Sequence, residues 1–190
     1  MTPAASVGGD GRLRLFLALR LPGDVLDAVE AWQRGALPGV RQVGREQLHV
    51  TLAFLGSRPA QELDGILEVL RGAASRAGRE IRLAPVGYRE TRSVGMLVLD
   101  DESDRATALA GDLHERLERL GVYERERRPW LPHVTVARFR ERPRLRPEPP
   151  ALRTFVPSDA AAYLSRLRPS GAEYHVLEAV ALGPTDIERE

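Results

Sequence analysis

The tripeptide His-Val-Thr occurs twice in the chain, as His49-Val50-Thr51 and as His133-Val134-Thr135. In a β-strand, residues two apart point to the same face, so each copy would present an imidazole beside a hydroxyl, with valine on the other face. Histidine titrates close to neutral pH, so one imidazole can donate a proton while the other accepts one. The two copies therefore predict general acid–base chemistry, with the threonine hydroxyls donating hydrogen bonds to an anionic substrate.

Hydrolysis of a cyclic phosphodiester needs such a pair. A base must deprotonate water and an acid must protonate the departing ribose oxygen, and in an in-line displacement the two lie on opposite sides of phosphorus. Each proton transfer contributes about 10²–10⁴-fold to the rate. One His-x-Thr unit alone is more often structural, but two among only four histidines favour catalysis. Of the other two, His114 is interpreted as a polar position on a helix. His175 is interpreted as a strand residue, and the sequence does not define to which side of the strand its side chain points.

Other reaction types find little support in the sequence. The chain has no cysteine, which excludes thiolate nucleophiles, disulfides and cysteine-ligated metal sites. A helical His-Glu-x-x-His, a Gly-x-Ser-x-Gly elbow, a Walker loop and a dinucleotide fingerprint are all absent. Two histidines with two threonines are a poor metal site. We therefore predict a reaction without metal or cofactor. An RNA-binding module without turnover is the alternative, although binding alone gives no reason for two matched histidines.

The basic residues point to an anionic partner. All 28 are arginine, which codon bias explains, but the guanidinium group suits phosphate oxygens well. Residues 125–153 contain nine arginines against three glutamates and flank the second His-Val-Thr.

The chain lacks the long apolar run of a membrane span. The absence of cysteine fits a cytoplasmic protein, and a monomer is the default for this composition.

The periodicity of apolar residues predicts an α+β fold. Each His-Val-Thr strand is preceded by a helix, which suggests a weak internal repeat. Two lobes related by an approximate twofold would place the two motifs on opposite walls of one cleft. Residues 1–11 are predicted to be a disordered tail, residues 12–190 a single bilobal domain, and residues 141–150 a loop. Strands are predicted over residues 13–21, 48–55, 81–88, 96–99, 132–139, 160–167 and 174–182, and helices over 22–35, 60–77 and 104–120.

With these residues in place, the chain resembles the 2H phosphoesterase superfamily, and within it the RNA 2′,3′-cyclic phosphodiesterases, also called 2′-5′ RNA ligases. The resemblance extends over residues 13–182. It rests on the opening RLFLALRLP, on EQLHVTL continuing to FLG, on RPWLPHVTVAR, and on the final SGAEYHVLEAVAL. Two motifs with matching flanks make it specific.

The resemblance implies a bilobal, pseudo-twofold fold, in which two mostly antiparallel sheets line a central cleft and helices lie outside. It also implies hydrolysis of an RNA 2′,3′-cyclic phosphate end to a 2′-phosphomonoester. In that reaction His49 would be the proton donor and His133 the proton acceptor, while Thr51 and Thr135 hold the phosphate. The reverse reaction, 2′-5′ RNA ligation, stays open.

Three further residues are candidates for substrate binding, on geometry and likeness together. Phe16 would stack a base at the cleft floor, although a plain core position fits it equally well. Arg138 and Arg128 would contact phosphate. The expected partner is RNA with a 2′,3′-cyclic phosphate end. Both tRNA fragments and small cyclic nucleotides remain open as substrates.

Overall fold

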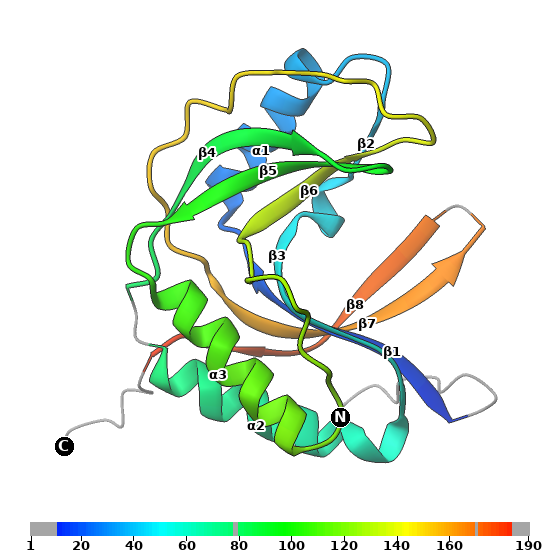
Figure 1. Cartoon of the computed structure of the whole chain (residues 1–190), viewed down its shortest axis with the longest axis vertical. Coiled ribbons are helices and arrows are strands. Elements are labelled where there is room, and N and C mark those ends of the chain that lie inside the picture. Colours follow the sequence, from blue (N-terminus) through cyan, green and yellow to red (C-terminus); the bar gives the residue numbers. More distant parts are fainter. Residues whose placement is uncertain (1–10, 78–79, 170, 184–190) are drawn as a thin grey trace.

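An antiparallel sheet of eight strands organises the chain in this computed structural model, which describes residues 11–77, 80–169 and 171–183 (Figure 1). The strand order is β4-β5-β6-β3-β1-β7-β8, and β2 pairs with β6. The strands are β1 Arg12–Arg20, β2 Arg41–Gln42, β3 His49–Pro59, β4 Leu83–Glu90, β5 Val94–Asp101, β6 His133–Arg138, β7 Asp159–Arg168 and β8 Gly171–Val180. The helices are α1 Gly23–Ala36, α2 Leu63–Arg76 and α3 Arg105–Arg119, with 3₁₀ turns at Arg45–Gln47 and Ala60–Glu62.

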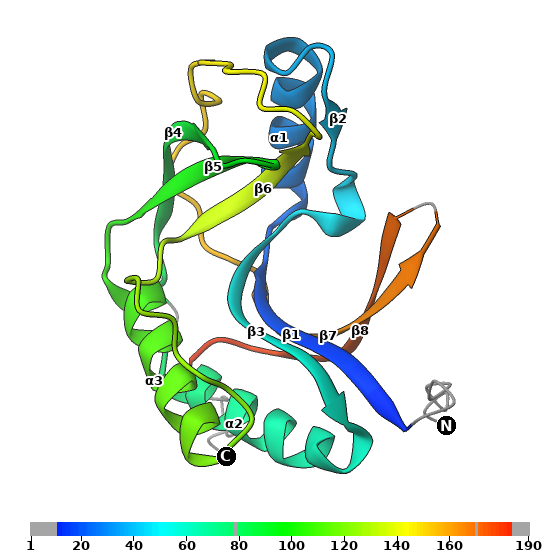
Figure 2. The same ribbon diagram turned by 45° about the vertical axis from the view of Figure 1, so that its right-hand side comes forward.

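The sheet consists of two halves that meet at one residue pair. Strands β3 and β6 pair only between Val50 and Val134, whereas the neighbouring strand pairs form long ladders. Figure 2 shows the resulting curl, with β6 and the β7–β8 hairpin rising on either side of β1 and β3. The predicted pair of sheets is therefore replaced by one continuous sheet, because a single backbone pair still connects the halves. The twofold relation between the halves stays a prediction.

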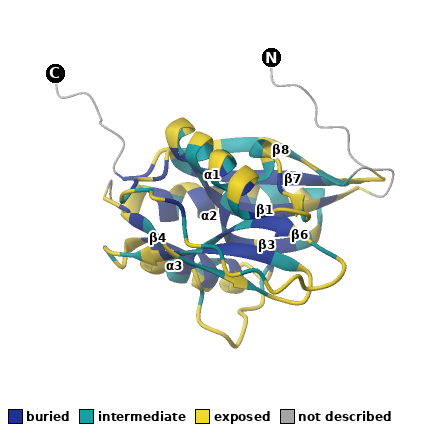
Figure 3. Cartoon of the chain, turned by 90° about the horizontal axis from the view of Figure 1, so that it is seen from above, coloured by how far each residue is buried: buried dark blue, intermediate teal, exposed yellow. Residues whose placement is uncertain are grey.

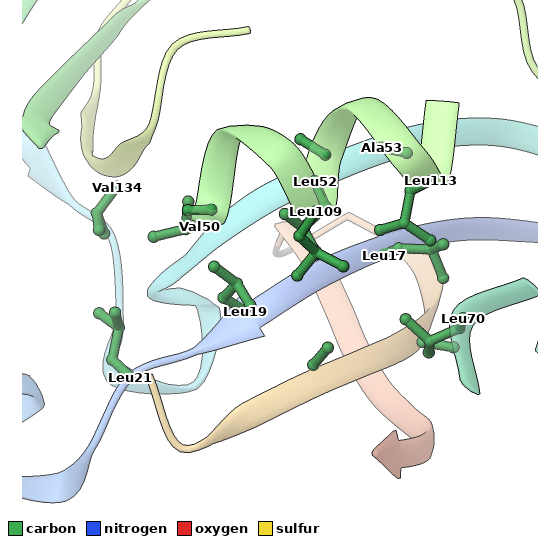
Figure 4. Packing of buried hydrophobic residues seen from close by; sticks show 14 of the residues in the cluster. Leu17, Leu19, Leu21, Val50, Leu52, Ala53, Leu70, Leu109, Leu113 and Val134 are labelled. Carbon is green, nitrogen blue, oxygen red and sulfur yellow. The ribbon is translucent and has the colours of Figure 1, made fainter. Parts of the chain in front are cut away.

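Helices cover the sheet on the side away from the two motifs. Leu15, Leu17 and Leu19 of β1 belong to the main core, to which α2 and α3 contribute. Figure 4 shows Leu17 with Leu113 of α3 and Leu70 of α2. Viewed from above, the buried residues concentrate on the central strands, and the outer helix faces and loops are exposed (Figure 3).

The opposite face of β1 carries a second, smaller cluster. Phe16 and Ala18 are buried there with Ala161 and Tyr163 of β7, and Tyr174 of β8 packs against them. A central strand of a curled sheet is thus apolar on both faces, although only one face contacts the helices. The ring of His49, on the neighbouring strand β3, stacks on Phe16 of this smaller cluster.

The predicted elements are present, with shifts at their ends. Of the predicted tail, residues 1–10 lie outside the described residues. Gly11 is described, and its carbonyl accepts a hydrogen bond from the Ala60 amide. No helix in the described part of the chain is long and apolar enough to cross a membrane.

Candidate active site

The register of β3 and β6 brings both motifs to one face. Val50 and Val134 are antiparallel partners and are buried, so the residues on either side of each valine point the other way. This register sets His49 across from Thr135 and Thr51 across from His133. All four side chains line one cleft of about 570 Å³. A single substrate group can therefore meet imidazoles and hydroxyls from both strands.

Side chains replace the backbone hydrogen bonds that β3 and β6 do not make with each other. Beyond the Val50–Val134 pair the strands separate, and their buried carbonyls need other donors. Trp130 Nε1 donates to the Thr51 carbonyl over 3.0 Å, and His114 Nε2 donates to the Leu52 carbonyl over 2.7 Å. These bonds hold the first motif in place from two directions.

His114 and Gln33 are structural residues that the sequence did not reveal. The interpretation of His114 as a polar helix position missed its burial and its bond to β3. Gln33 of α1 is also buried, and its Nε2 donates to the carbonyls of Val43 and Val136 over 3.0 and 2.8 Å. Gln33 therefore supports the strand of the second motif, as His114 supports that of the first.

The environment of His49 favours its neutral form. Its pKa is lowered from 6.5 to about 4, chiefly by burial; the nearby His133 and Arg138 also lower it, while a hydrogen bond to the Gln47 backbone acts in the opposite direction. Nε2 of His49 lies 3.1 Å from the hydroxyl oxygen of Thr51. At neutral pH, His49 is therefore uncharged in the free protein.

The hydrogen bond of His133 defines its tautomer. Its Nδ1 lies 2.8 Å from the carbonyl oxygen of Leu131. A carbonyl can only accept, so Nδ1 carries the hydrogen, and in the neutral ring the lone pair is on Nε2. This orientation suits a general base whose basic nitrogen is free for a water molecule.

Phe16 lies at the cleft floor, where it supports His49. Its ring centroid is 4.9 Å from that of His49 and 4.7 Å from that of Tyr163. Only 3% of Phe16 is exposed, so its ring offers no open face to a nucleobase. The position favours the core interpretation, in which Phe16 helps to exclude water from one side of His49.

Phe54 is an exposed aromatic residue of β3, further along the strand that carries the first motif. It is not among the site residues predicted from the sequence. Phe54 of β3 is 49% exposed and lines the cleft, with the Arg14 guanidinium carbon 4.8 Å from its ring centroid. Strict alternation from His49 would have pointed Ala53 into the cleft. A register shift against β1, where Leu17 pairs with Ala53 but Ala18 with Thr51, brings Phe54 to that side instead.

The two predicted arginines occupy different places. Arg138, at the end of β6, is exposed and lines the cleft, and its charge reaches His49. Within the described ranges, no carboxylate forms an ion pair with it. Arg128 is exposed in the loop before β6 and is not among the cleft-lining residues. Its role in phosphate binding stays a prediction. Among the residues that the structure describes, no three His, Cys, Asp or Glu side chains cluster as metal ligands would.

Two His-x-Thr units on paired strands, facing one cleft, define a 2H phosphoesterase. A family model described as the 2′-5′ RNA ligase superfamily matches residues 21–170. The chain belongs to this family.

Relatives of known name and structure agree with this assignment. The chain is 34% identical over 180 residues to an RNA 2′,3′-cyclic phosphodiesterase of Thermus thermophilus, covering 90% of each chain. It is 30% identical over 127 residues to the Escherichia coli protein of the same name, covering 66% of this chain and 71% of the relative. A crystal structure of a T. thermophilus protein superposes with a TM-score of 0.78 at 29% identity, over 90% of this chain and 99% of that one. The NADP⁺ complex of E. coli LigT shares the fold, with a TM-score of 0.77 at 24% identity, over 90% and 98%.

Proposed function

We propose that this protein hydrolyses the 2′,3′-cyclic phosphate at RNA ends to a 2′-phosphomonoester. The observation that carries the proposal is the antiparallel register at Val50–Val134, which turns both histidines and both threonines into one cleft. Relatives named RNA 2′,3′-cyclic phosphodiesterase, including the one with 34% identity, support the same activity.

Each histidine has one role in the proposed step. His133 Nε2 accepts a proton from water, whose oxygen forms a new bond to phosphorus. The bond from phosphorus to the ribose 3′-oxygen breaks, and His49 donates the proton that this oxygen takes up. Thr51 and Thr135 donate hydrogen bonds to the non-bridging oxygens, where negative charge accumulates. The product is a 2′-phosphate beside a free 3′-hydroxyl.

The proton on His49 arrives with the substrate in this scheme. A ring with a pKa of about 4 is uncharged at neutral pH before substrate binds. The cyclic phosphate carries a negative charge, which favours the imidazolium form of His49 and offsets the positive charge of Arg138. Substrate binding thus converts His49 from a neutral ring to an acid.

This scheme predicts a ligand-dependent titration of His49. In the free protein its ring should titrate near pH 4, and a saturating 2′-nucleotide should raise that pKa by about two to three units, toward neutral pH, because the phosphate stabilises the charged form. NMR titration of the four histidine rings measures this, with His49→Asn identifying the signal. The exposed His175 serves as the control, since it lies outside the cleft. An unchanged His49 titration would contradict substrate-supplied protonation.

The base of the terminal nucleotide is proposed to stack on Phe54. Its ring is the large exposed aromatic surface of the cleft, and Arg14 already lies over part of it. Arg138 provides a guanidinium at the same cleft for phosphate oxygens. In this arrangement Phe16 keeps its place beneath His49.

Product analysis tests the proposal directly. The protein is incubated with an oligoribonucleotide ending in a 2′,3′-cyclic phosphate, with EDTA present, and the ends are resolved by chromatography. We expect a 2′-phosphate and no 3′-phosphate, at a rate that the chelator leaves unchanged. A second RNA with a free 5′-hydroxyl reveals ligation if a joined product forms. Binding without any product would assign the protein to the alternative, a module without turnover.

A further inference from the structure

A second group of arginines surrounds a pocket outside the catalytic cleft. The pocket has a volume of about 330 Å³. It lies where the end of β4 meets the segment that follows β6. Its lining residues are Tyr88, Arg89, Glu90, Arg142, Arg144, Leu145 and Arg146.

A buried carboxylate gives this pocket a defined shape. The Glu90 side chain is 1% exposed. Its Oε2 accepts hydrogen bonds from Arg142 Nε over 3.1 Å and from the Arg144 amide over 2.9 Å, and its Oε1 accepts from the Leu145 amide over 2.8 Å. Arg144 also has a φ of 59°, a conformation that non-glycine residues adopt only when their surroundings hold them there. The arginine-bearing segment is therefore fixed to β4.

Tyr88 completes this arrangement by lying close to the backbone of β5. Its hydroxyl donates to Glu90 Oε1 over 3.3 Å. A Cβ atom on Gly95 would come within 2.2 Å of that hydroxyl oxygen, so a glycine is required for the tyrosine to reach the carboxylate.

The pocket has more positive charge than its own carboxylate neutralises. Glu90 pairs with Arg142. Arg89, Arg144 and Arg146 are exposed, and no carboxylate in the described ranges forms an ion pair with them. The exposed Glu141 and Glu148 of the same segment do not line the pocket. Guanidinium groups around a hollow match the oxygens of a phosphate group.

A further hollow extends from the catalytic cleft along the same segment after β6. Its charged lining residues are Arg41, Arg138, Arg140 and Glu141, and it shares Arg41 and Arg138 with the cleft. Arg142 comes four positions after Arg138, with three residues between them, so their Cα atoms are at most about 14 Å apart. Figure 1 shows this segment, in yellow, turning beside the tip of the β4–β5 hairpin and then running over the half-sheet. A strand of a few nucleotides spans such a distance.

We propose that the Glu90-centred arginine pocket binds a backbone phosphate of the RNA strand whose cyclic end lies in the cleft. This inference rests on the proposed function and narrows its substrate class to oligoribonucleotides. A cyclic mononucleotide would reach only the catalytic cleft. A longer strand would gain contacts at Arg144 and Arg146, and its affinity would depend more steeply on salt.

The test compares two double variants of equal charge. Arg144→Gln with Arg146→Gln removes two pocket arginines and leaves the Arg142–Glu90 pair intact. Arg34→Gln with Arg105→Gln removes two exposed arginines on α1 and α3. The readouts are kcat/KM on a cyclic mononucleotide and on an oligoribonucleotide of about eight nucleotides ending in a 2′,3′-cyclic phosphate, each over a range of salt.

We expect the pocket variant to lose about tenfold in kcat/KM on the oligonucleotide and to keep its rate on the mononucleotide. The salt slope of oligonucleotide binding should fall by about 0.7 for each phosphate contact removed. The control variant should match the unmodified protein on both substrates. Equal losses in the two variants, equal losses on the two substrates, or no loss would each overturn the proposal.

A separate binding experiment distinguishes a failure of this inference from a failure of the proposed function. Fluorescence anisotropy with an oligonucleotide ending in a 2′-phosphate measures the pocket without any turnover. If the unmodified protein hydrolyses neither substrate, the proposed function is wrong, but the binding experiment still measures whether the pocket contributes to the affinity for RNA. If the pocket variant loses affinity for inorganic phosphate but not for the oligonucleotide, the site serves free anions and the RNA assignment is wrong.

Discussion

Replacing His133 by alanine is expected to lower kcat by about 10²–10⁴-fold, because its Nε2 is the atom that takes the proton from water in the proposed step. His49→Ala should cause a loss of the same order, since the 3′-oxygen would then leave without a proton donor. The double variant should be little slower than either single one, because the two residues act in one step. Single-turnover rates on an oligonucleotide with a cyclic phosphate end measure all three.

His175→Ala is the matched control for these variants. His175 is exposed on β8, lies outside the cleft and faces Glu173 at 3.6 Å. Its removal should leave turnover intact, and circular dichroism should show that every variant is folded. Full activity in either cleft variant would reject the two-histidine mechanism.

Leu17→Ala is expected to lower the free energy of unfolding by about 2–5 kcal/mol. Leu17 is fully buried on the central strand β1, on the face that contacts α2 and α3. Truncation there removes buried apolar surface and leaves a cavity between the sheet and its two helices. Urea denaturation at constant pH measures the loss.

The exposed Leu120 provides the control for this core variant. It follows α3 and is one of the exposed large hydrophobic residues. Leu120→Ala should therefore cost about 1 kcal/mol or less. Where Leu17→Ala remains folded, it should keep its turnover, because its side chain faces away from the cleft. A loss of activity in fully folded Leu17→Ala would show that the core and the cleft are coupled.

Sequence alone predicts the reacting groups because alternation in a short strand is a local property. His49, Thr51, His133 and Thr135 share a face in any regular strand, and the structure places all four in one cleft. The helices and most strands also follow from local periodicity. The two-residue strand β2 does not, because its pairing with β6, rather than its own residues, defines it.

The cleft wall beyond the motifs depends on long-range pairing that local patterns do not contain. Phe54 enters the cleft through a register shift against β1, and nothing in HVTLAFLG marks where that shift occurs. His114 and Trp130 reach carbonyls of β3 from distant parts of the chain. The Glu90 pocket likewise joins residues about 50 positions apart. Such contacts follow from the fold, so the sequence could not reveal them.

The single residue pair between β3 and β6, Val50 with Val134, determines which parts of this fold must keep their structure and which parts can change. We call this pair the rung. The relative position of the two imidazole rings depends on that rung and on the adjacent peptide units. A slip of one residue at the rung would turn valines toward the substrate, whereas insertions in the outer hairpins would leave the rings in place. Changes in length or charge at the periphery, such as those in the arginine-bearing segment after β6, can therefore leave the geometry of the two His-Val-Thr units unchanged; under the proposed function, such changes would alter which RNA is bound.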